Sequence, residues 1–203
     1  MKIRSLGRTG LKVTNLCLGT MTFGNQADKN ISFEILNKAF DAGVNFIDTA
    51  DVYPIGRSSY EIAGATESII GEWLEGKRDK VVLATKCFGV MGPGANDKGL
   101  SRKHIIAAVE DSLRRLKTDY IDLYQAHQFD DSTPVDETLR AFDDLIEQGK
   151  VRYIGVSNWR AWQVAKANGI ANRKKLRPNR ERSASLQSVI SDDRGRLGSN
   201  GTG

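Results

Sequence analysis

Ionisable and hydrogen-bonding side chains follow the apolar segments of this sequence at corresponding places. The segments are VNFID (44–48), which ends in Asp48 and precedes Tyr53; VVLATK (81–86), which ends in Lys86; YIDLYQ (120–125), which precedes His127; and VRYIGV (151–156), which precedes Ser157 and Asn158. If these segments are parallel strands, their carboxyl ends meet at one edge, where the active sites of βα barrels lie. We therefore expect these side chains to converge.

The first four of these side chains would support a specific chemistry. A carboxylate beside a lysine forms a charge pair, and a lysine cation next to a tyrosine favours the phenolate and lowers the tyrosine pKa from about 10. A tyrosine tuned in this way can donate a proton near neutral pH. A histidine on another strand can hold a carbonyl oxygen. The set predicts an acid catalyst for carbonyl reduction, with the hydride supplied by a cofactor.

Each of these residues also has a plainer interpretation when it is taken alone. Asp48 could cap a helix, Tyr53 could lie at an amphipathic rim, Lys86 could be a solvated lysine at a strand end, and His127 could be a packing residue. Their coincidence at corresponding strand ends favours the catalytic interpretation.

The elements that must position these residues alternate between strand and helix. The sequence predicts a hairpin around Gly7–Gly10, a first strand near 16–20, and the four apolar strands above, each followed by an amphipathic helix. The expected helices span about 33–40 before Gly43, start at Ser101, run from Pro134 to Gly149, and span 160–168 before Gly169. This alternation indicates an α/β fold with a parallel sheet.

Five βα units are complete by residue 171, whereas a closed barrel has eight. An open doubly wound sheet also fits five units. The first strand–helix turn, GTMTFGNQ, argues against it because this turn is not a G-x-G-x-x-G phosphate loop. The loop 89–99, GVMGPGANDKG, either contributes to a pocket or is a surface excursion.

Composition narrows the class of protein further. Residues 172–203 hold eight Lys/Arg and three Asp/Glu, which accounts for the whole net charge of +5. This tail has no aromatic residue to stack on bases, so we expect no nucleic-acid partner.

No apolar run approaches the roughly 18 residues of a membrane helix, and the start has no signal-peptide core, so we expect a cytoplasmic protein. Cys17 and Cys87 predict free buried thiols, and no metal site is expected.

Over residues 1–171 the sequence resembles the aldo/keto reductases. The signatures are LGRTGLKVTNLCLGTMTFG, GVNFIDTADVY, VVLATK, LSRKHIIAAVEDSLRRLKTDYIDLYQAH and EQGKVRYIGVSN, in the family's order. The resemblance implies a (β/α)₈ TIM barrel with an N-terminal hairpin, here truncated after about five units. It also implies NADP(H) as cofactor and a small carbonyl or alcohol as substrate.

The same resemblance implies the roles of individual residues. Tyr53 would be the general acid, Lys86 and Asp48 would tune it, and His127 would orient the carbonyl. Ser157 and Asn158 would bind the nicotinamide carboxamide, and Gly19, Thr20 and Asp48 would lie beside the cofactor. An alternative is a non-catalytic NADP-binding regulatory partner, since potassium-channel β-subunits share the scaffold. Those subunits lack a histidine at the strand-four position, and His127 favours the enzyme.

The resemblance ends after IANRKKL, and residues 172–203 form a second, basic segment that we expect to be disordered. PNRERSASLQSVIS can be written in codons whose next reading frame encodes RIVSVQPHYNLLY, which resembles the family's sixth strand. We therefore interpret the tail as an out-of-frame translation. Because an incomplete barrel leaves strand edges unpaired, we expect this chain to fold poorly and to bind NADPH weakly.

Overall fold

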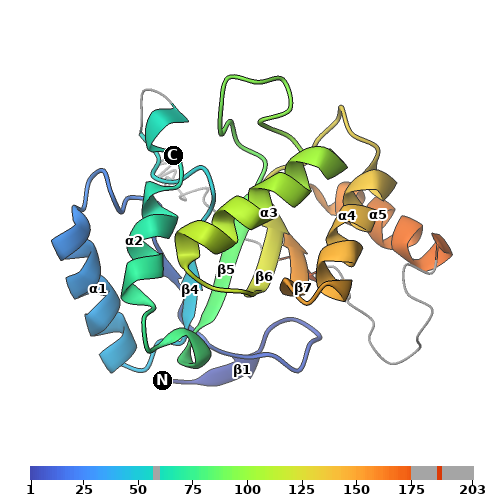
Figure 1. Cartoon of the computed structure of the whole chain (residues 1–203). Coiled ribbons are helices and arrows are strands. Elements are labelled where there is room, and N and C mark those ends of the chain that lie inside the picture. Colours follow the sequence, from blue (N-terminus) through green and yellow to red (C-terminus); the bar gives the residue numbers. More distant parts are fainter. Residues whose placement is uncertain (57–59, 175–186, 189–203) are drawn as a thin grey trace, which may run out of the picture.

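A computed structural model of the chain describes residues 1–56, 60–174 and 187–188, and it shows a parallel sheet covered by helices (Figure 1). The strands are β1 (Ile3–Ser5), β2 (Lys12–Thr14), β3 (Leu18–Gly19), β4 (Phe46–Asp48), β5 (Val82–Cys87), β6 (Ile121–Ala126), β7 (Val151–Val156) and β8 (Gln187–Ser188). The helices are α1 (Lys29–Asp41), α2 (Ala65–Trp73), α3 (Arg102–Leu116), α4 (Val135–Glu147) and α5 (Ala161–Lys174), with short 3₁₀ turns η1 (Tyr60–Ile62) and η2 (Arg78–Lys80).

The main sheet has the strand order β3-β4-β5-β6-β7-β8, and every neighbouring pair is parallel. The predicted α/β class is confirmed, and the arrangement is that of an incomplete (β/α)₈ barrel. The sheet has one strand more than the five that the sequence predicted. The added strand is β8, whose Gln187 and Ser188 pair with Gly155 and Val156. A strand edge offers main-chain hydrogen bonds to any segment, whatever its side chains.

The predicted N-terminal hairpin is present. β1 and β2 pair antiparallel, with Ile3 opposite Thr14 and Ser5 opposite Lys12. The hairpin contributes Val13 to an apolar cluster with Phe46, Val82 and Leu123 of the main sheet. The hairpin therefore packs against the strands that carry the candidate site.

The helices begin and end where the sequence carries capping residues. Ser101 accepts a hydrogen bond from the backbone N–H of His104 (3.3 Å), and Asp28 caps α1 in the same way through the N–H of Ile31 (2.9 Å). Gly43 and Gly149 follow α1 and α4 with φ of 84° and 73°. A residue with a β-carbon rarely adopts this left-handed conformation, so a glycine at each position allows the helix to end there.

The expected end of the last helix at Gly169 is wrong. α5 continues through Gly169 to Lys174. A glycine inside a helix costs only about 1 kcal/mol relative to alanine. Here Ile170 and Ala171 lie beyond the glycine and pack against Val135 and Leu139 of α4. This burial favours continuation of the helix.

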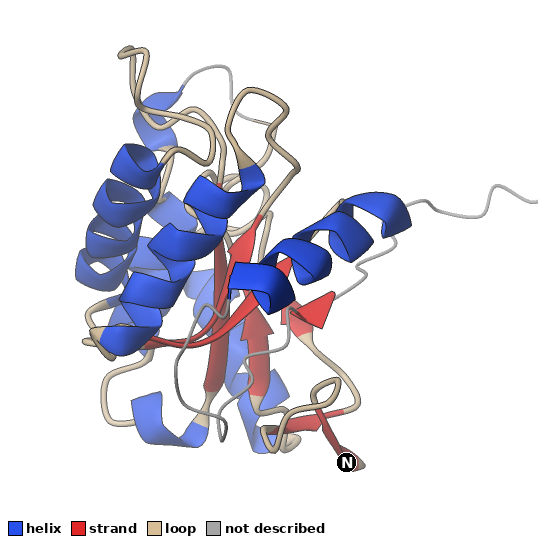
Figure 2. Cartoon of the chain, turned by 90° about the vertical axis from the view of Figure 1, so that its right-hand side faces the viewer, coloured by secondary structure: helices blue, strands red, loops and turns tan. Residues whose placement is uncertain are grey.

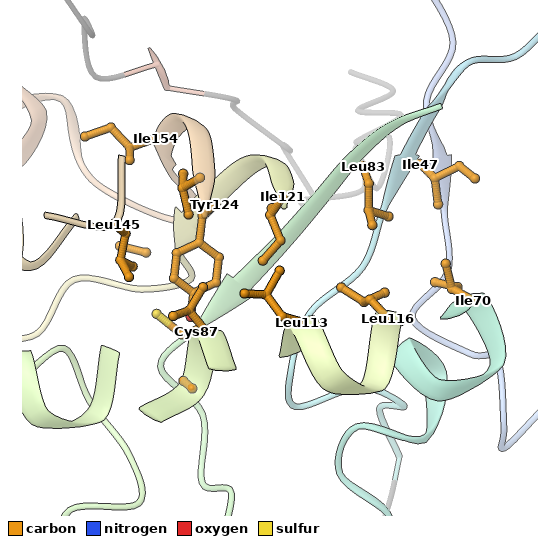
Figure 3. Packing of buried hydrophobic residues seen from close by; sticks show 14 of the residues in the cluster. Ile47, Ile70, Leu83, Cys87, Leu113, Leu116, Ile121, Tyr124, Leu145 and Ile154 are labelled. Atoms are coloured by element: carbon orange, nitrogen blue, oxygen red, sulfur yellow. The ribbon is translucent and has the colours of Figure 1, made fainter. Parts of the chain in front are cut away.

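The largest apolar cluster fills the space between the sheet and the helices (Figure 3). Leu113 and Leu116 of α3 and Ile70 of α2 meet the outer face of the sheet, where Leu83 and Tyr124 lie. Seen from the side, the helices lie along this face of the sheet (Figure 2). The side chains that alternate with these strand residues point to the opposite, inner face.

Both cysteines are free, but only Cys87 is buried, and Cys17 is exposed just before β3, contrary to the prediction that both are buried. No helix within the described ranges is long and apolar enough to span a bilayer. The predictions of disorder and of an out-of-frame tail fall outside the described residues, apart from residues 172–174 and the two residues of β8. The expected disorder is wrong at these positions, which belong to α5 and to a strand.

Candidate active site

The carboxyl ends of the parallel strands bring the predicted residues to one edge of the sheet. Asp48 is the last residue of β4 and pairs in register with Gly19 of β3. Lys86 lies near the end of β5, His127 follows β6, and Ser157 follows β7. The expected convergence therefore results from the parallel register of consecutive strands.

Lys86 and Asp48 form a partly buried ion pair at this edge. The Lys86 ammonium lies 2.5 Å from Oδ2 of Asp48 and donates a second hydrogen bond to the Thr49 carbonyl (2.8 Å). Lys86 is only 3% exposed, so the plainer interpretation as a solvated strand-end lysine is wrong. A charge buried this deeply is costly unless it is paired, and Asp48 supplies the pairing.

Tyr53 lies over this ion pair. The Lys86 Nζ is 5.1 Å from the centre of the Tyr53 ring, and Tyr53 is 9% exposed. The backbone around Tyr53 is fixed on both sides, because its N–H donates to Ala50 and its carbonyl accepts from Gly64. The phenol is therefore presented to the site by a hydrogen-bonded loop that follows β4.

His127 packs edge-on against Tyr53, with 5.7 Å between the ring centres. Burial, and next the positive charge of Lys86, lower the pKa of His127 to about 4. Its imidazole is therefore neutral at neutral pH and can donate one hydrogen bond. Its backbone is held by Cys87, which accepts from its N–H at 3.0 Å, and by the Asn158 side chain, which donates to its carbonyl at 3.0 Å.

The predicted cofactor residues lie on either side of this group. Asn158 has a left-handed φ of 57°, and its Nδ2 donates to both His127 and the Ser157 hydroxyl. A β-carbon built on Gly19 meets no atom within 4 Å, so the space beside β3 is open. Thr20 is fully buried, and both its N–H and its hydroxyl donate to the Asp48 carbonyl. Thr20 therefore fixes β3 to β4.

Sequence reasoning missed Gln125, which also reaches this site. Its Nε2 lies 3.2 Å from Oδ1 of Asp48, and the residue is 1% exposed. The segment YIDLYQ predicts only an apolar strand. The available signal was a long amide two residues after Leu123, on the same face of the strand. A buried amide needs a hydrogen-bond partner.

A second buried cluster behind the site was also missed. Glu67 of α2 is fully buried, accepts from the Thr85 hydroxyl at 2.6 Å, and pairs with Arg115 of α3 at 2.7 Å. Asp51 is also fully buried. Burial, and next the Glu67 carboxylate, raise the pKa of Asp51 well above its ordinary value. The backbone N–H of Asp51 donates to the Lys86 carbonyl (3.0 Å).

The loop 89–99 lines a pocket, and the lining does not include Asp48, Tyr53, Lys86 or His127. The pocket has a volume of about 480 Å³, and its walls include Phe88, Val90 and Lys98 from the β5–α3 connection and Asp130 and Thr133 from the β6–α4 connection. Both connections follow strands that carry site residues. This size lies within the range of small-molecule sites.

Taken together, the geometry places the phenol ring of Tyr53 beside a buried ammonium and a neutral imidazole. Such a group can donate a proton to an oxygen and stabilise the negative charge that develops there. Within the described residues, no cluster of three or more His, Cys, Asp and Glu could hold a metal ion.

Comparison with known proteins gives matches over most of the chain. Residues 15–180 match the sequence model of the aldo/keto reductase family. An uncharacterized oxidoreductase YrpG from Bacillus subtilis is 46% identical over 183 residues, which cover 87% of this chain and 55% of that protein. A probable voltage-gated potassium channel subunit beta from Arabidopsis thaliana is 45% identical, over 85% of this chain and 51% of that protein. Norsolorinic acid reductase A from Aspergillus parasiticus is 39% identical, over 83% and 45%. The chain spans about half the length of these relatives.

Proposed function

This chain belongs to the aldo/keto reductase family, and on that premise we propose that it is an NADP(H)-dependent oxidoreductase that interconverts small aldehydes or ketones with alcohols. The observation that carries the proposal is the group formed by Tyr53, Lys86, Asp48 and His127 at one edge of the sheet. The oxidoreductase names of two relatives support the same class of reaction.

The residues at the two sides of the site fit a nicotinamide cofactor. Among the described residues, Oδ1 of Asn158 accepts no hydrogen bond while its Nδ2 is engaged, so an acceptor is available to a carboxamide N–H. The open space beside Gly19 gives room for a flat ring next to the sheet. Ser157 and Asn158 would hold the carboxamide, and Gly19 would lie against the ring. When bound, the cofactor supplies or accepts the hydride.

In the proposed reduction, Tyr53 donates its phenolic proton to the substrate carbonyl oxygen. The Lys86 cation, 5.1 Å from the ring centre, stabilises the phenolate that this step leaves behind. Asp48 holds that cation in place through its 2.5 Å ion pair. The neutral imidazole of His127 donates a hydrogen bond to the same carbonyl oxygen and orients it. In the direction of oxidation the phenolate accepts the alcohol proton.

The free thiols of Cys17 and Cys87 support a reducing compartment such as the cytoplasm. A second candidate function is that of a non-catalytic NADP-binding regulatory partner. The 45% identity with a probable potassium channel subunit beta favours this alternative. Both functions would use the same cofactor residues, and they differ in turnover.

The test is NADPH-dependent reduction of a generic aldehyde by the protein and by its Tyr53→Phe variant. Loss of a general acid lowers kcat by roughly 10²- to 10⁴-fold. Tyr60→Phe is the matched control, because Tyr60 is 40% exposed in η1 and lies outside the group. Turnover that survives in Tyr53→Phe would contradict the assigned acid, and binding of NADPH without turnover would favour the regulatory partner.

A further inference from the structure

Gln125 lies beside the ion pair on the inner face of the sheet. It is the Cα partner of Lys86 across the β5–β6 ladder, and its other partner in register is Gly155 of β7, which has no side chain. The adjacent Tyr124 belongs to the cluster that faces the helices, so Gln125 points to the opposite face. The amide is therefore buried next to the lysine that the proposed chemistry needs.

The contact that Gln125 makes is with Asp48, two strands away. Asp48 lies on β4 and Gln125 on β6, and the side chains meet above β5, where Lys86 also reaches Asp48. Within the described residues, Asp48 accepts from two side chains, and they divide its oxygens. Oδ2 accepts from Lys86 at 2.5 Å and Oδ1 accepts from Gln125 at 3.2 Å.

We propose that Gln125 is a positioning residue for the proton-transfer site: its amide holds one oxygen of Asp48, so that the other oxygen stays on Lys86 and keeps the ammonium beneath the Tyr53 ring. This inference rests on the proposed function of Tyr53. A carboxylate that is bound at one oxygen only can rotate about its Cβ–Cγ bond, and the ammonium bound to it moves with it. With both oxygens bound, the cation has a fixed position.

A double-mutant cycle tests the proposed route through Asp48. In Gln125→Met the unbranched side chain is kept and the donor is lost, and we expect kcat to fall roughly tenfold, the effect of one hydrogen bond to a charged group. KM should stay within about twofold because the side-chain hydrogen bond of Gln125 is made to Asp48. In an Asp48→Asn background the same change should lower kcat by less than about twofold. A tenfold fall in both backgrounds would overturn the proposal.

A second variant tests the contact without any turnover. In Gln125→Glu a second carboxylate faces Oδ1 of Asp48, and at alkaline pH, where both acids are ionised, the pair carries one additional negative charge. The midpoint of Tyr53 ionisation, followed by NMR of ring-labelled tyrosine and assigned with Tyr53→Phe, should rise by roughly one pH unit. The other titratable groups around the pair are Lys86, His127 and Cys17.

Gln163→Glu is the matched control for this titration. Gln163 is also buried, at 7% exposure, but it lies in α5, where its side-chain oxygen accepts from the backbone N–H of Arg160. A purely structural role of Gln125 would change the melting temperature and leave the Tyr53 midpoint where Gln163→Glu leaves it, and this result would overturn the proposal. If the unmodified protein lacks turnover but Gln125→Glu still raises the Tyr53 midpoint, the proposed function is refuted and the contact between Gln125 and Asp48 is supported.

Discussion

Replacing His127 by glutamine removes an imidazole that the fold keeps neutral. Burial, and next the Lys86 charge, lower its pKa from the ordinary 6.5 to about 4. The unfolded chain therefore binds a proton at a pH where the folded chain does not. The stability that this difference contributes is fully present above pH 6.5 and is lost as the pH falls towards 4. Between pH 7 and pH 5 the loss is about 2 kcal/mol, since each pH unit below 6.5 contributes about 1.4 kcal/mol.

The assay compares the free energy of urea unfolding of the protein and of His127→Gln at the two pH values. The advantage of the unmodified protein over the variant should shrink by about 2 kcal/mol from pH 7 to pH 5. All other titrating groups are common to both proteins and cancel in the difference, including His104, whose pKa burial also lowers. NMR gives a direct check, because the chain has two histidines. An unchanged difference, or a His127 signal that titrates near 6.5, would refute the reasoning.

Two further outcomes are expected. Burial, and next the Glu67 carboxylate, raise the pKa of Asp51, so the unfolded chain releases the proton of this carboxyl above pH 3.8 while the folded chain still keeps it. Asp51→Asn should therefore gain unfolding free energy relative to the unmodified protein as the pH of a urea titration is raised above 3.8, and a constant difference would show an ionised carboxylate. A β-carbon on Gly71 would lie 2.2 Å from the backbone oxygen of Arg115. Thermal melts should therefore show Gly71→Ala to be destabilised by about 1–3 kcal/mol despite the better helix propensity of alanine, whereas Gly169→Ala, whose methyl group meets nothing, should be neutral or stabilising.

The sheet and most helices could be predicted because their signals lie in side chains. β5, β6 and β7 were each placed within one residue, since their segments are apolar and buried along nearly their whole length. α3 was placed because Ile105, Val109 and Leu113 recur at the spacing of one helix face, and all three are buried against the sheet. β8 could not be predicted from a pattern of apolar side chains, because its pairing with β7 is made by main-chain groups.

The candidate site could be predicted as far as it follows from strand ends. Lys86 and Asp48 meet because neighbouring parallel strands end at the same edge. The Gln125–Asp48 contact could not be predicted, because it spans an intervening strand and depends on the three-dimensional shape of the inner face. The burial of Asp51 could not be predicted either, because it depends on how α2 and α3 pack behind β5.

The strands of the main sheet follow one another in space in the same order as in the chain. Each new strand pairs with the strand synthesised just before it, so no pairing has to wait for a distant part of the sequence. A chain that leaves the ribosome can therefore add one strand and one helix at a time. The ion pair between Asp48 and Lys86 joins two consecutive strands, so its formation needs no part of the chain beyond β5.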